Sequence, residues 1–264
     1  MAPDRVMNIT ILGSGTCVPS LERRPCSILI QWNRTFILVD AGPGIMGQLL
    51  KAGVKITDID LILLSHFHLD HSAEVAPFIF ALKYSGMNRT KRLTLGGGPG
   101  LNAFFNRLNL AHDNSLEMDG AGLAILELSP PGSLDTVFPN PADGPAPLKV
   151  SYSRVAHKPE SLAYRFEEPN GFSLVYSGDT DMSDELVGIS KNADLLICES
   201  SFPDDKKRSG HLTPSLAGDI AARARVKRLV LTHFYPECED ADILAQCRKS
   251  FAGPVVRAKD LLRL

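Results

Sequence analysis

The stretch from His66 to His71 holds three histidines and one aspartate within six positions, directly after the apolar run 61–64. A short apolar run of this kind is typical of a buried strand. The loop that follows a strand can direct several side chains toward one point, and imidazole with carboxylate is a ligand set that zinc accepts. The pattern therefore predicts a metal centre at a strand end. A chance cluster in a polar loop is disfavoured, because the whole chain has only seven histidines.

Three further candidate ligands each follow an apolar, strand-like run. They are His157, Asp179 and His233. In a layered α/β protein the loops at the strand ends converge on one edge, where sites are built. We therefore expect these side chains to meet the cluster at 66–71. His112 instead precedes turn-like residues and is expected on the surface.

The order His-x-His-x-Asp-His, then His157, Asp179 and His233, resembles the metallo-β-lactamase-fold hydrolase superfamily. This resemblance implies two metal ions. The first would be held by His66, His68 and His157, the second by Asp70, His71 and His233, and Asp179 would bridge the two. Two zinc ions are expected, although manganese or iron suit the same ligands. Metals about 3.5–4 Å apart can clamp both oxygens of a displacement and supply a bridging hydroxide near neutral pH.

Within this superfamily the chain is most similar to the ribonuclease Z-like branch, which processes tRNA 3′ ends. The similarity covers about residues 8–257, and its motifs are Ile11–Thr16, Phe36–Gly44, Pro159–Phe166, Cys198–Phe202 and Gly210–Thr213. The resemblance implies a catalytic pair, in which His211 would protonate the leaving oxygen and Glu199 would orient His211. As a hypothesis of mechanism, Asp70 is the third catalytic residue, which steers the attacking water or accepts its proton in addition to binding metal.

Two features depart from the tRNA-processing enzymes. His157 and Asp179 are only 22 positions apart, and one predicted hairpin fills the interval, so there is no room for that branch's tRNA-binding arm. The stretch after His233 is acidic between residues 237 and 240, where the branch often carries an arginine. Together with a net charge of −2, this acidic rim disfavours a large polyanionic partner.

These features predict a phosphodiesterase whose partner is a small-molecule phosphoester, such as a nucleotide or cyclic nucleotide diester. One alternative is a tRNA 3′-end-processing endonuclease with an unusual recognition surface. Another is an arylsulfatase, lactone hydrolase or thioester hydrolase on the same metals. A β-lactamase is disfavoured because Asp179 stands where the zinc β-lactamases carry a metal-binding cysteine. A non-catalytic scaffold is disfavoured because all seven expected ligands are present.

The expected fold is α/β, a four-layer αββα sandwich forming a single domain over residues 1–264. Strands are expected at 7–12, 26–31, 35–39, 61–64, 92–95, 123–128, 148–155, 161–166, 172–176, 194–198 and 228–231. Helices are expected at 43–52, 72–85, 99–108, 182–189, 213–225 and 240–250, the last capped by Asp240. The strands fall into two groups, 7–128 and 148–256, one for each sheet. The proline-rich segment 129–147 is expected to be an excursion between the two halves.

Two loops allow more than one interpretation. Residues 96–100, Gly-Gly-Gly-Pro-Gly, could cradle a phosphate through backbone N–H groups, but a strand-to-helix turn is favoured because the lysine of a nucleotide-binding loop is missing. The basic run Lys206–Arg208 is favoured as a solvated loop, with a phosphate clamp beside His211 as the alternative.

The five cysteines have no paired spacing, which argues against a disulfide framework and for a reducing, cytoplasmic location. Cys198 is expected to be buried in a strand, and Cys238 is interpreted as a structural thiol rather than a ligand. No signal peptide or membrane span is recognised in the sequence. A homodimer is compatible with the resemblance.

Overall fold

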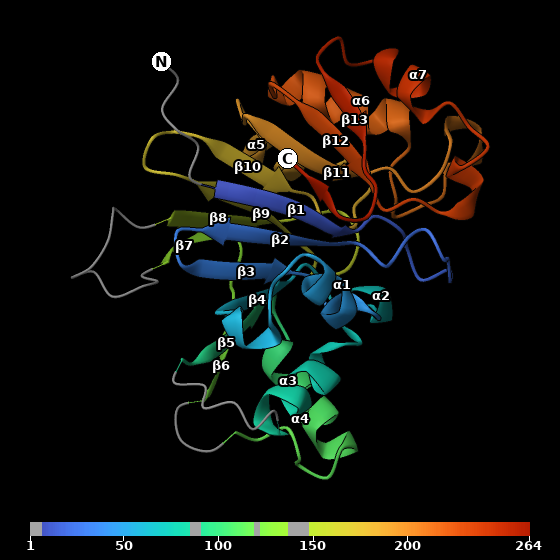
Figure 1. Ribbon diagram of the computed structural model, residues 1–264. Helices are drawn as coiled ribbons and strands as arrows, with labels where there is room; N and C mark the ends of the chain where they lie inside the picture. Colours follow the sequence, from blue (N-terminus) through green and yellow to red (C-terminus); the bar gives the residue numbers. More distant parts are fainter. Residues whose placement is uncertain (1–6, 85–90, 119–121, 137–147) are drawn as a thin grey trace.

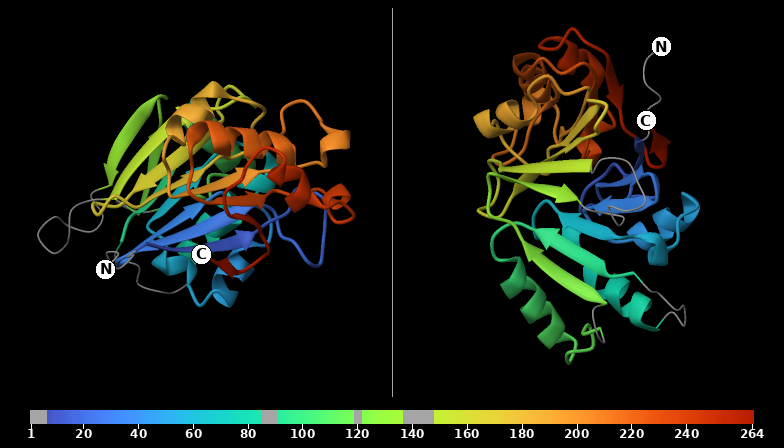
Figure 2. Two further views of the ribbon diagram at one scale, coloured as in Figure 1. Left: turned by 90° about the horizontal axis from the view of Figure 1, so that it is seen from above. Right: turned by 90° about the vertical axis from the view of Figure 1, so that its left-hand side faces the viewer.

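The computed structural model describes residues 7–84, 91–118, 122–136 and 148–264 (Figure 1). Two seven-stranded sheets pack face to face, and helices cover the outer face of each (Figure 2). This is the predicted αββα sandwich. No helix of the described residues is long and apolar enough to cross a membrane.

The first sheet has the order β14-β1-β2-β3-β4-β5-β6. It is antiparallel from β14 to β3 and parallel from β3 to β6. Its strands are β1 (Met7–Gly13), β2 (Ser27–Trp32), β3 (Thr35–Val39), β4 (Leu61–Leu64), β5 (Leu93–Gly97), β6 (Leu123–Glu127) and β14 (Leu262–Arg263).

The second sheet has the order β13-β12-β11-β10-β9-β8-β7. It is parallel from β13 to β10 and antiparallel from β10 to β7. Its strands are β7 (Gly132–Thr136), β8 (Leu148–Arg154), β9 (Leu162–Glu167), β10 (Ser173–Tyr176), β11 (Leu195–Glu199), β12 (Leu229–Thr232) and β13 (Val255–Arg257).

The helices divide between the two outer layers, as Figure 1 shows. The first sheet is covered by α1 (Ile45–Lys51), α2 (Leu69–Ser72), α3 (Val75–Tyr84) and α4 (Leu101–Ala111). The second sheet is covered by α5 (Asp184–Ile189), α6 (Pro214–Ala224) and α7 (Ile243–Arg248). Three short 3₁₀ turns lie at Ile56–Asp58, Asp204–Lys206 and Pro236–Cys238.

The side chains of a central strand alternate between two hydrophobic cores, which explains the continuous apolar runs in the sequence. In β4, Leu61 and Leu63 join the core between the two sheets, whereas Ile62 and Leu64 join the core under the helices. Successive side chains of a strand point to opposite faces, so a strand covered on both faces is apolar throughout. These buried runs hold the strand ends in place, and the loops after them form one edge of the sandwich.

Several predicted boundaries were wrong. The expected helix 72–85 begins later, as α3 at Val75, and a separate short helix, α2, comes before it; the last predicted residue lies outside the described part. The final helix is shorter than 240–250 and is capped by Asp242, whose side chain accepts from the Ala245 amide. Asp240 therefore does not cap it.

Three strands, β7, β13 and β14, were not predicted. β7 lies inside the proline-rich segment and pairs with β8 at the edge of the second sheet. β14 returns to the first sheet beside β1, so the division into one early and one late group of strands is not complete. Residues 137–147 of the proline-rich segment lie outside the described part. In the glycine run at 96–100, the first two residues end β5 and residues 98–100 form the predicted turn to α4.

Candidate metal centre

The predicted ligands lie together at the edge where strands of both sheets end. The cluster from His66 to His71 follows β4 and continues into α2, while the other three ligands follow strands of the second sheet. Gly178 allows this approach, because a Cβ there would lie 2.7 Å from the Cβ of Ser65. Its φ of 58° is also a conformation that glycine adopts without strain. The close contact brings Asp179 against the first sheet.

Asp179 stands at the centre of the cluster, with one carboxylate oxygen toward each predicted ligand set. Oδ2 lies 3.8 Å from Nε2 of His66 and 4.0 Å from Nε2 of His157. Oδ1 lies 3.3 Å from Nε2 of both His71 and His233. This geometry is that of a carboxylate able to bridge two cations.

The spacing of the remaining ligand atoms fits two cation sites. Nε2 of His157 lies 3.2 Å from Nδ1 of His68, and Nε2 of His71 lies 3.2 Å from Nε2 of His233. The edge of a tetrahedron around zinc is about 3.3 Å when its bonds to nitrogen are about 2.0–2.1 Å. Asp70 completes the second set, with Oδ2 3.5 Å from Nε2 of His233.

Two buried polar atoms at this centre have no hydrogen-bond partner. They are Nε2 of His66 and Oδ1 of Asp179. Leaving such atoms unsatisfied is costly in a folded protein, and one cation at each ligand set would satisfy them. Two of the three ligand groupings that the geometry selects correspond to the sets that the sequence resemblance implied, and the third joins Asp179 and His233 to His211. The donor set therefore fits a dinuclear metal centre.

Asp40 positions His71 from behind. Its Oδ2 lies 2.8 Å from Nδ1 of His71 and accepts from the hydroxyl groups of Ser65 and Tyr176, also at 2.8 Å. Its Oδ1 accepts from the Ser65 amide at 2.7 Å. Such partners fix the orientation of a metal-binding imidazole and leave Nε2 facing the metal.

Two residues of the centre have strained backbones. Asp40 follows β3 with φ of 63°, and His233 follows β12 with φ of 61°. Non-glycine residues rarely adopt this left-handed conformation, which costs on the order of 1 kcal/mol and concentrates at functional sites. The surrounding sheet ends hold both side chains toward the cluster despite that cost.

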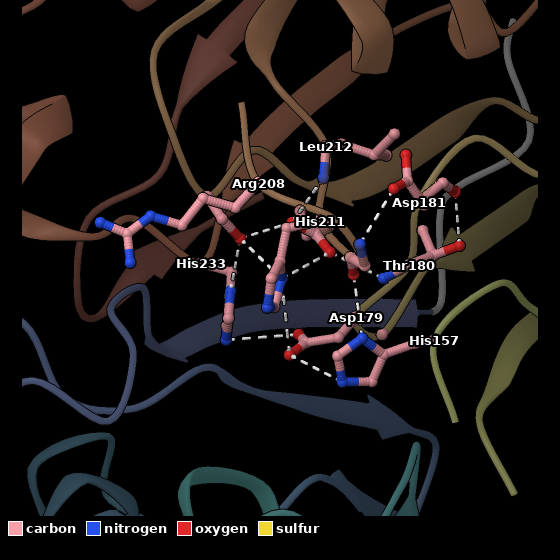
Figure 3. A network of polar contacts seen from close by, with 12 residues as sticks. His157, Asp179, Thr180, Asp181, Arg208, His211, Leu212 and His233 are labelled. Carbon is pink, nitrogen blue, oxygen red and sulfur yellow. Dashed lines mark hydrogen bonds and ion pairs between the residues drawn. The ribbon is translucent and has the colours of Figure 1, made fainter. Parts of the chain in front are cut away.

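His233 and His157 are also oriented through their second ring nitrogen. Nδ1 of His233 lies 2.9 Å from the hydroxyl of Ser201, and Nδ1 of His157 lies 2.9 Å from the carbonyl oxygen of Gly210. In both rings Nε2 then points into the centre, as Figure 3 shows. The loop that contains Gly210 also carries His211, so one loop supports a predicted ligand and a predicted catalytic residue.

His211 lies beside His233 and Asp179 of this centre (Figure 3). Nδ1 of His211 lies 3.1 Å from Oε1 of Glu199. The buried carboxylate also accepts from the Thr180 amide, the Leu212 amide and the Ser201 hydroxyl. A proton on Nδ1 is therefore bound to Glu199, and Nε2 is left to exchange a proton with a substrate.

The sequence matches the family described as "Beta-lactamase superfamily domain" over residues 35–234. The chain belongs to this superfamily. It is 28% identical to a ribonuclease Z of Streptomyces avermitilis, over 98% of this chain and 97% of the relative. It is 30% identical to an uncharacterized protein of Mycobacterium tuberculosis, over 94% of this chain and 88% of the relative. The crystal structure of the metallo-β-lactamase fold protein YhfI from Bacillus subtilis is similar, with a TM-score of 0.81, 24% identity and 98% coverage of both chains.

The chain is thus a ribonuclease Z-like member of the β-lactamase superfamily, and its relatives indicate a metal-dependent hydrolase. In this superfamily member the electrostatics prepare the ligands for cations. Burial, the largest influence, lowers the pKa of His66 well below its ordinary value and lowers that of His68 too. Burial opposes ionisation of Asp179, but His233 and His71 outweigh it and hold its pKa well below the ordinary value. Neutral imidazoles and an ionised carboxylate are the forms that bind metal.

His71 is the exception among these ligands. Burial lowers its pKa, but the neighbouring Asp179 and Asp40 outweigh burial and raise the pKa well above the ordinary value. A metal ion must displace the proton from Nε2, since Nδ1 faces Asp40. Binding of the second cation is therefore expected to release a proton.

Three residues outside the candidate metal centre lie in the environments that the sequence predicted. His112 is exposed, and Cys198 is fully buried in β11. Cys238 is buried with its thiol against the carbonyl oxygens of Ser200 and Ser201, apart from the candidate metal groups. These three agree with the prediction.

The basic run at 206–208 is exposed throughout, as the favoured interpretation as a solvated loop predicts. Lys207 binds Asp181 at 2.8 Å and its own loop's carbonyl at Arg208, while Arg208 stacks on Phe202 and pairs with Glu237. Asp181 also accepts from the Gly210 amide at 2.9 Å. The run is therefore a solvated loop in which Lys207 and Arg208 also make contacts that hold the segment carrying His211.

Sequence reasoning missed the supporting residues Asp40, Ser201 and Asp181. Asp40 carried a detectable signal, because it is a carboxylate directly after the apolar strand β3, like the ligands themselves. Ser201 and Asp181 had no recognisable sequence signal, because their roles depend on which loops meet in the folded structure.

Proposed function

We propose that this protein is a dinuclear-metal phosphodiesterase that cleaves a small phosphodiester, such as a nucleotide or cyclic nucleotide diester. The observation that carries the proposal is the Glu199–His211 pair beside the Asp179-centred cluster. A phosphodiester is displaced in line, so it needs stabilisation of charge on one side and a proton for the leaving oxygen on the other.

The proposed metal ligands are those of the sequence analysis. The first cation is assigned to His66, His68 and His157, the second to Asp70, His71 and His233, and Asp179 is assigned to both. Two bound divalent cations would supply Lewis acidity toward the phosphoryl oxygens and a hydroxide at neutral pH.

His211 is suited to the role of general acid. Burial lowers its pKa, but the hydrogen bond and charge of Glu199 outweigh burial and raise the pKa above the ordinary value. The imidazolium form is thus more favoured than in a free histidine, and its Nε2 proton would be the one given to a leaving oxygen. We assign to Asp70 the further role of orienting the attacking water, because its Oδ2 lies 3.5 Å from Nε2 of His233 and the residue lines a pocket together with the exposed Leu69.

The short chain segment between His157 and Asp179 supports the proposal of a small substrate. β9 and β10 pair as a tight antiparallel hairpin joined by residues 168–172, and no further segment projects from it. The alignment with the Streptomyces avermitilis ribonuclease Z spans 307 positions, more than the 264 residues of this chain. That relative therefore contains segments that this chain lacks, whereas the alignment with the Mycobacterium tuberculosis protein spans 264 positions.

The second candidate is tRNA 3′-end processing, and the match to ribonuclease Z over nearly the whole chain favours it. The two candidates share the same metal chemistry and differ in how the substrate is held. The acidic residues after His233 and the absence of an arm in the described hairpin favour the smaller substrate.

The experiment compares three phosphodiesters, with a p-nitrophenyl sulfate and a lactone beside them, on protein whose metals have been quantified. The phosphodiesters are bis(p-nitrophenyl) phosphate, a 3′,5′-cyclic nucleotide and a tRNA precursor with a 3′ trailer. The proposal predicts metal-dependent cleavage of the first two and a kcat/KM on the precursor that is at least about 100-fold lower than on the cyclic nucleotide. Efficient trailer removal would replace the proposal with the second candidate. If a p-nitrophenyl sulfate or a lactone were cleaved and no diester were, both candidates would be wrong.

A further inference from the structure

A pocket of about 370 Å³ opens beside the proposed metal ligand Asp70. It lies between the β1–β2 loop, which contributes residues 16–20 and 23–25, and Pro43, Leu69 and Asp70 on the other side. Its volume is within the range of about 300–1,000 Å³ that suits small-molecule ligands. Because Asp70 belongs to both the pocket and the ligand set, a substrate held at the metals would extend into it.

Two neighbouring arginines of this loop have different environments. Arg23 is fully engaged, since it pairs with Glu239 at 2.6 Å, donates to Ser14 and Ala258, and stacks on Phe234. Arg24 lines the pocket, and its guanidinium donates to one carbonyl oxygen, that of Ser20, at 3.0 Å. No carboxylate of the described residues pairs with it. Arg24 is therefore a cation with free hydrogen-bonding capacity beside the proposed reaction centre.

The backbone and stem of Arg24 are held in place. Its amide donates to Oδ2 of Asp260 at 2.8 Å, and its carbonyl oxygen accepts from the Gly15 amide at 2.8 Å. The stem crosses Gly44, where a Cβ would lie 3.2 Å from Cδ of Arg24. A fixed arginine loses less conformational entropy when it binds an anion.

The rest of the pocket is mostly apolar. Val18, Pro19, Pro25, Pro43 and Leu69 contribute most of its wall, and Leu69 is 75% exposed. Its charged lining consists of Arg23, Arg24 and Asp70, of which Arg23 is paired and Asp70 faces the metal ligands. Arg24 is thus the one charge in the lining that is left for a ligand.

We propose that this pocket binds a second phosphate group of the substrate, separate from the diester that is cleaved, through the guanidinium of Arg24. The inference rests on the proposed phosphodiesterase function and narrows its substrate class. Guanidinium presents paired N–H donors that match phosphate oxygens. A diester has one negative charge, which the two cations would bind, so the anion at Arg24 must be another group. The apolar wall would contact the nucleoside that joins the two phosphates.

The test uses two chromogenic diesters that differ by one phosphate. They are the p-nitrophenyl ester of thymidine 5′-phosphate and the same ester of thymidine 3′,5′-bisphosphate. We expect the wild-type KM for the second to be about ten-fold lower, the size expected of one charge-assisted contact. Arg24→Gln should abolish this difference, and Arg24→Lys should keep part of it. Arg34→Gln, at the exposed β2–β3 turn on the opposite end of the strands, should leave it unchanged.

Calorimetric titration with thymidine 3′,5′-bisphosphate and thymidine 5′-phosphate separates this inference from the proposed function. If wild-type protein cleaves both esters with equal KM, the second-phosphate site is wrong and the phosphodiesterase stands. If it cleaves neither but binds the bisphosphate more tightly in an Arg24-dependent way, the site stands and the proposed function fails. The fold of Arg24→Gln is checked by circular dichroism. If the folded variant still prefers the compound with the second phosphate, the assignment of the site to Arg24 is wrong.

Discussion

The buried Glu199 and the half-buried His211 form a pair at the edge of the centre, with Oε1 of Glu199 3.1 Å from Nδ1 of His211. The carboxylate is 1% exposed and is satisfied by four donors, so it cannot turn away from the imidazole. The pair fixes the proton of His211 relative to the proposed metal ligands. Its role can be separated from metal binding by substitution.

His211→Ala should retain the metal content of the wild type and lower turnover selectively. General acid catalysis contributes about 10²- to 10⁴-fold, and a good leaving group needs it least. We therefore expect kcat to fall by about 100-fold or more on an alkyl phosphodiester and by less than about ten-fold on bis(p-nitrophenyl) phosphate. Metal analysis and parallel kinetics check this. An equal loss on both substrates would show that His211 does not donate the proton.

Asp179→Asn should remove the dinuclear character of the site. The amide has nearly the shape of the carboxylate but lacks the charge that faces both ligand sets at 3.3–4.0 Å. We expect the metal content to fall from about two per chain to about one or less, and chelation to lower the Tm of wild type more than that of the variant. His112→Ala, on an exposed histidine, is the control. Two metals retained in Asp179→Asn would contradict the bridging assignment.

Lys207→Met should impair catalysis more than stability. The ion pair with Asp181 is partly exposed and is worth about 1 kcal/mol or less, but it fixes the loop that carries His211 and Gly210. We expect kcat on a poor leaving group to fall several-fold while denaturant unfolding changes little. Lys206→Met, its exposed neighbour, should change neither quantity. If kcat were the same in both variants, the assignment of a positioning role to Lys207 would be wrong.

The cysteines should differ strongly in reactivity. All five are free, and only Cys17 is exposed. Burial raises the pKa of Cys26 and Cys238 to about 12 and that of Cys247 to about 11, and it also raises the pKa of Cys198. The thiolate is the reactive form, so a raised pKa suppresses the reaction at neutral pH. Native protein should take up one equivalent of iodoacetamide, at Cys17 by peptide mass spectrometry, and unfolded protein five. Rapid native labelling of Cys26 would contradict the packed core.

The αββα fold and the proposed ligand set could be predicted from the sequence because their signals are local. Proposed ligands such as His66 and Asp179 come shortly after strands that are buried on both faces. Such strands are apolar throughout, so they can be recognised in the sequence. β14 gave no such signal, because a two-residue strand at a sheet edge has no apolar run. β7 lies among prolines and glycine, which favour a loop interpretation.

The supporting network of the site could not be predicted for a different reason. The contact of Asp181 with Lys207 and the isolation of Arg24 from carboxylates depend on which loops meet in space. Arg23 and Arg24 are adjacent in sequence and chemically identical, yet one is tied to Glu239 and the other lines a pocket. Only the tertiary arrangement distinguishes them.

The most direct test of the account measures diester hydrolysis against metal occupancy in a single preparation. Protein stripped by a chelator is titrated with Zn²⁺ or Mn²⁺, and the initial rate on bis(p-nitrophenyl) phosphate is recorded with the bound metal per chain. A dinuclear phosphodiesterase predicts little activity up to about one metal and a rise to a plateau at about two. Full occupancy by two metals without diester cleavage, or cleavage by metal-free protein, would contradict it.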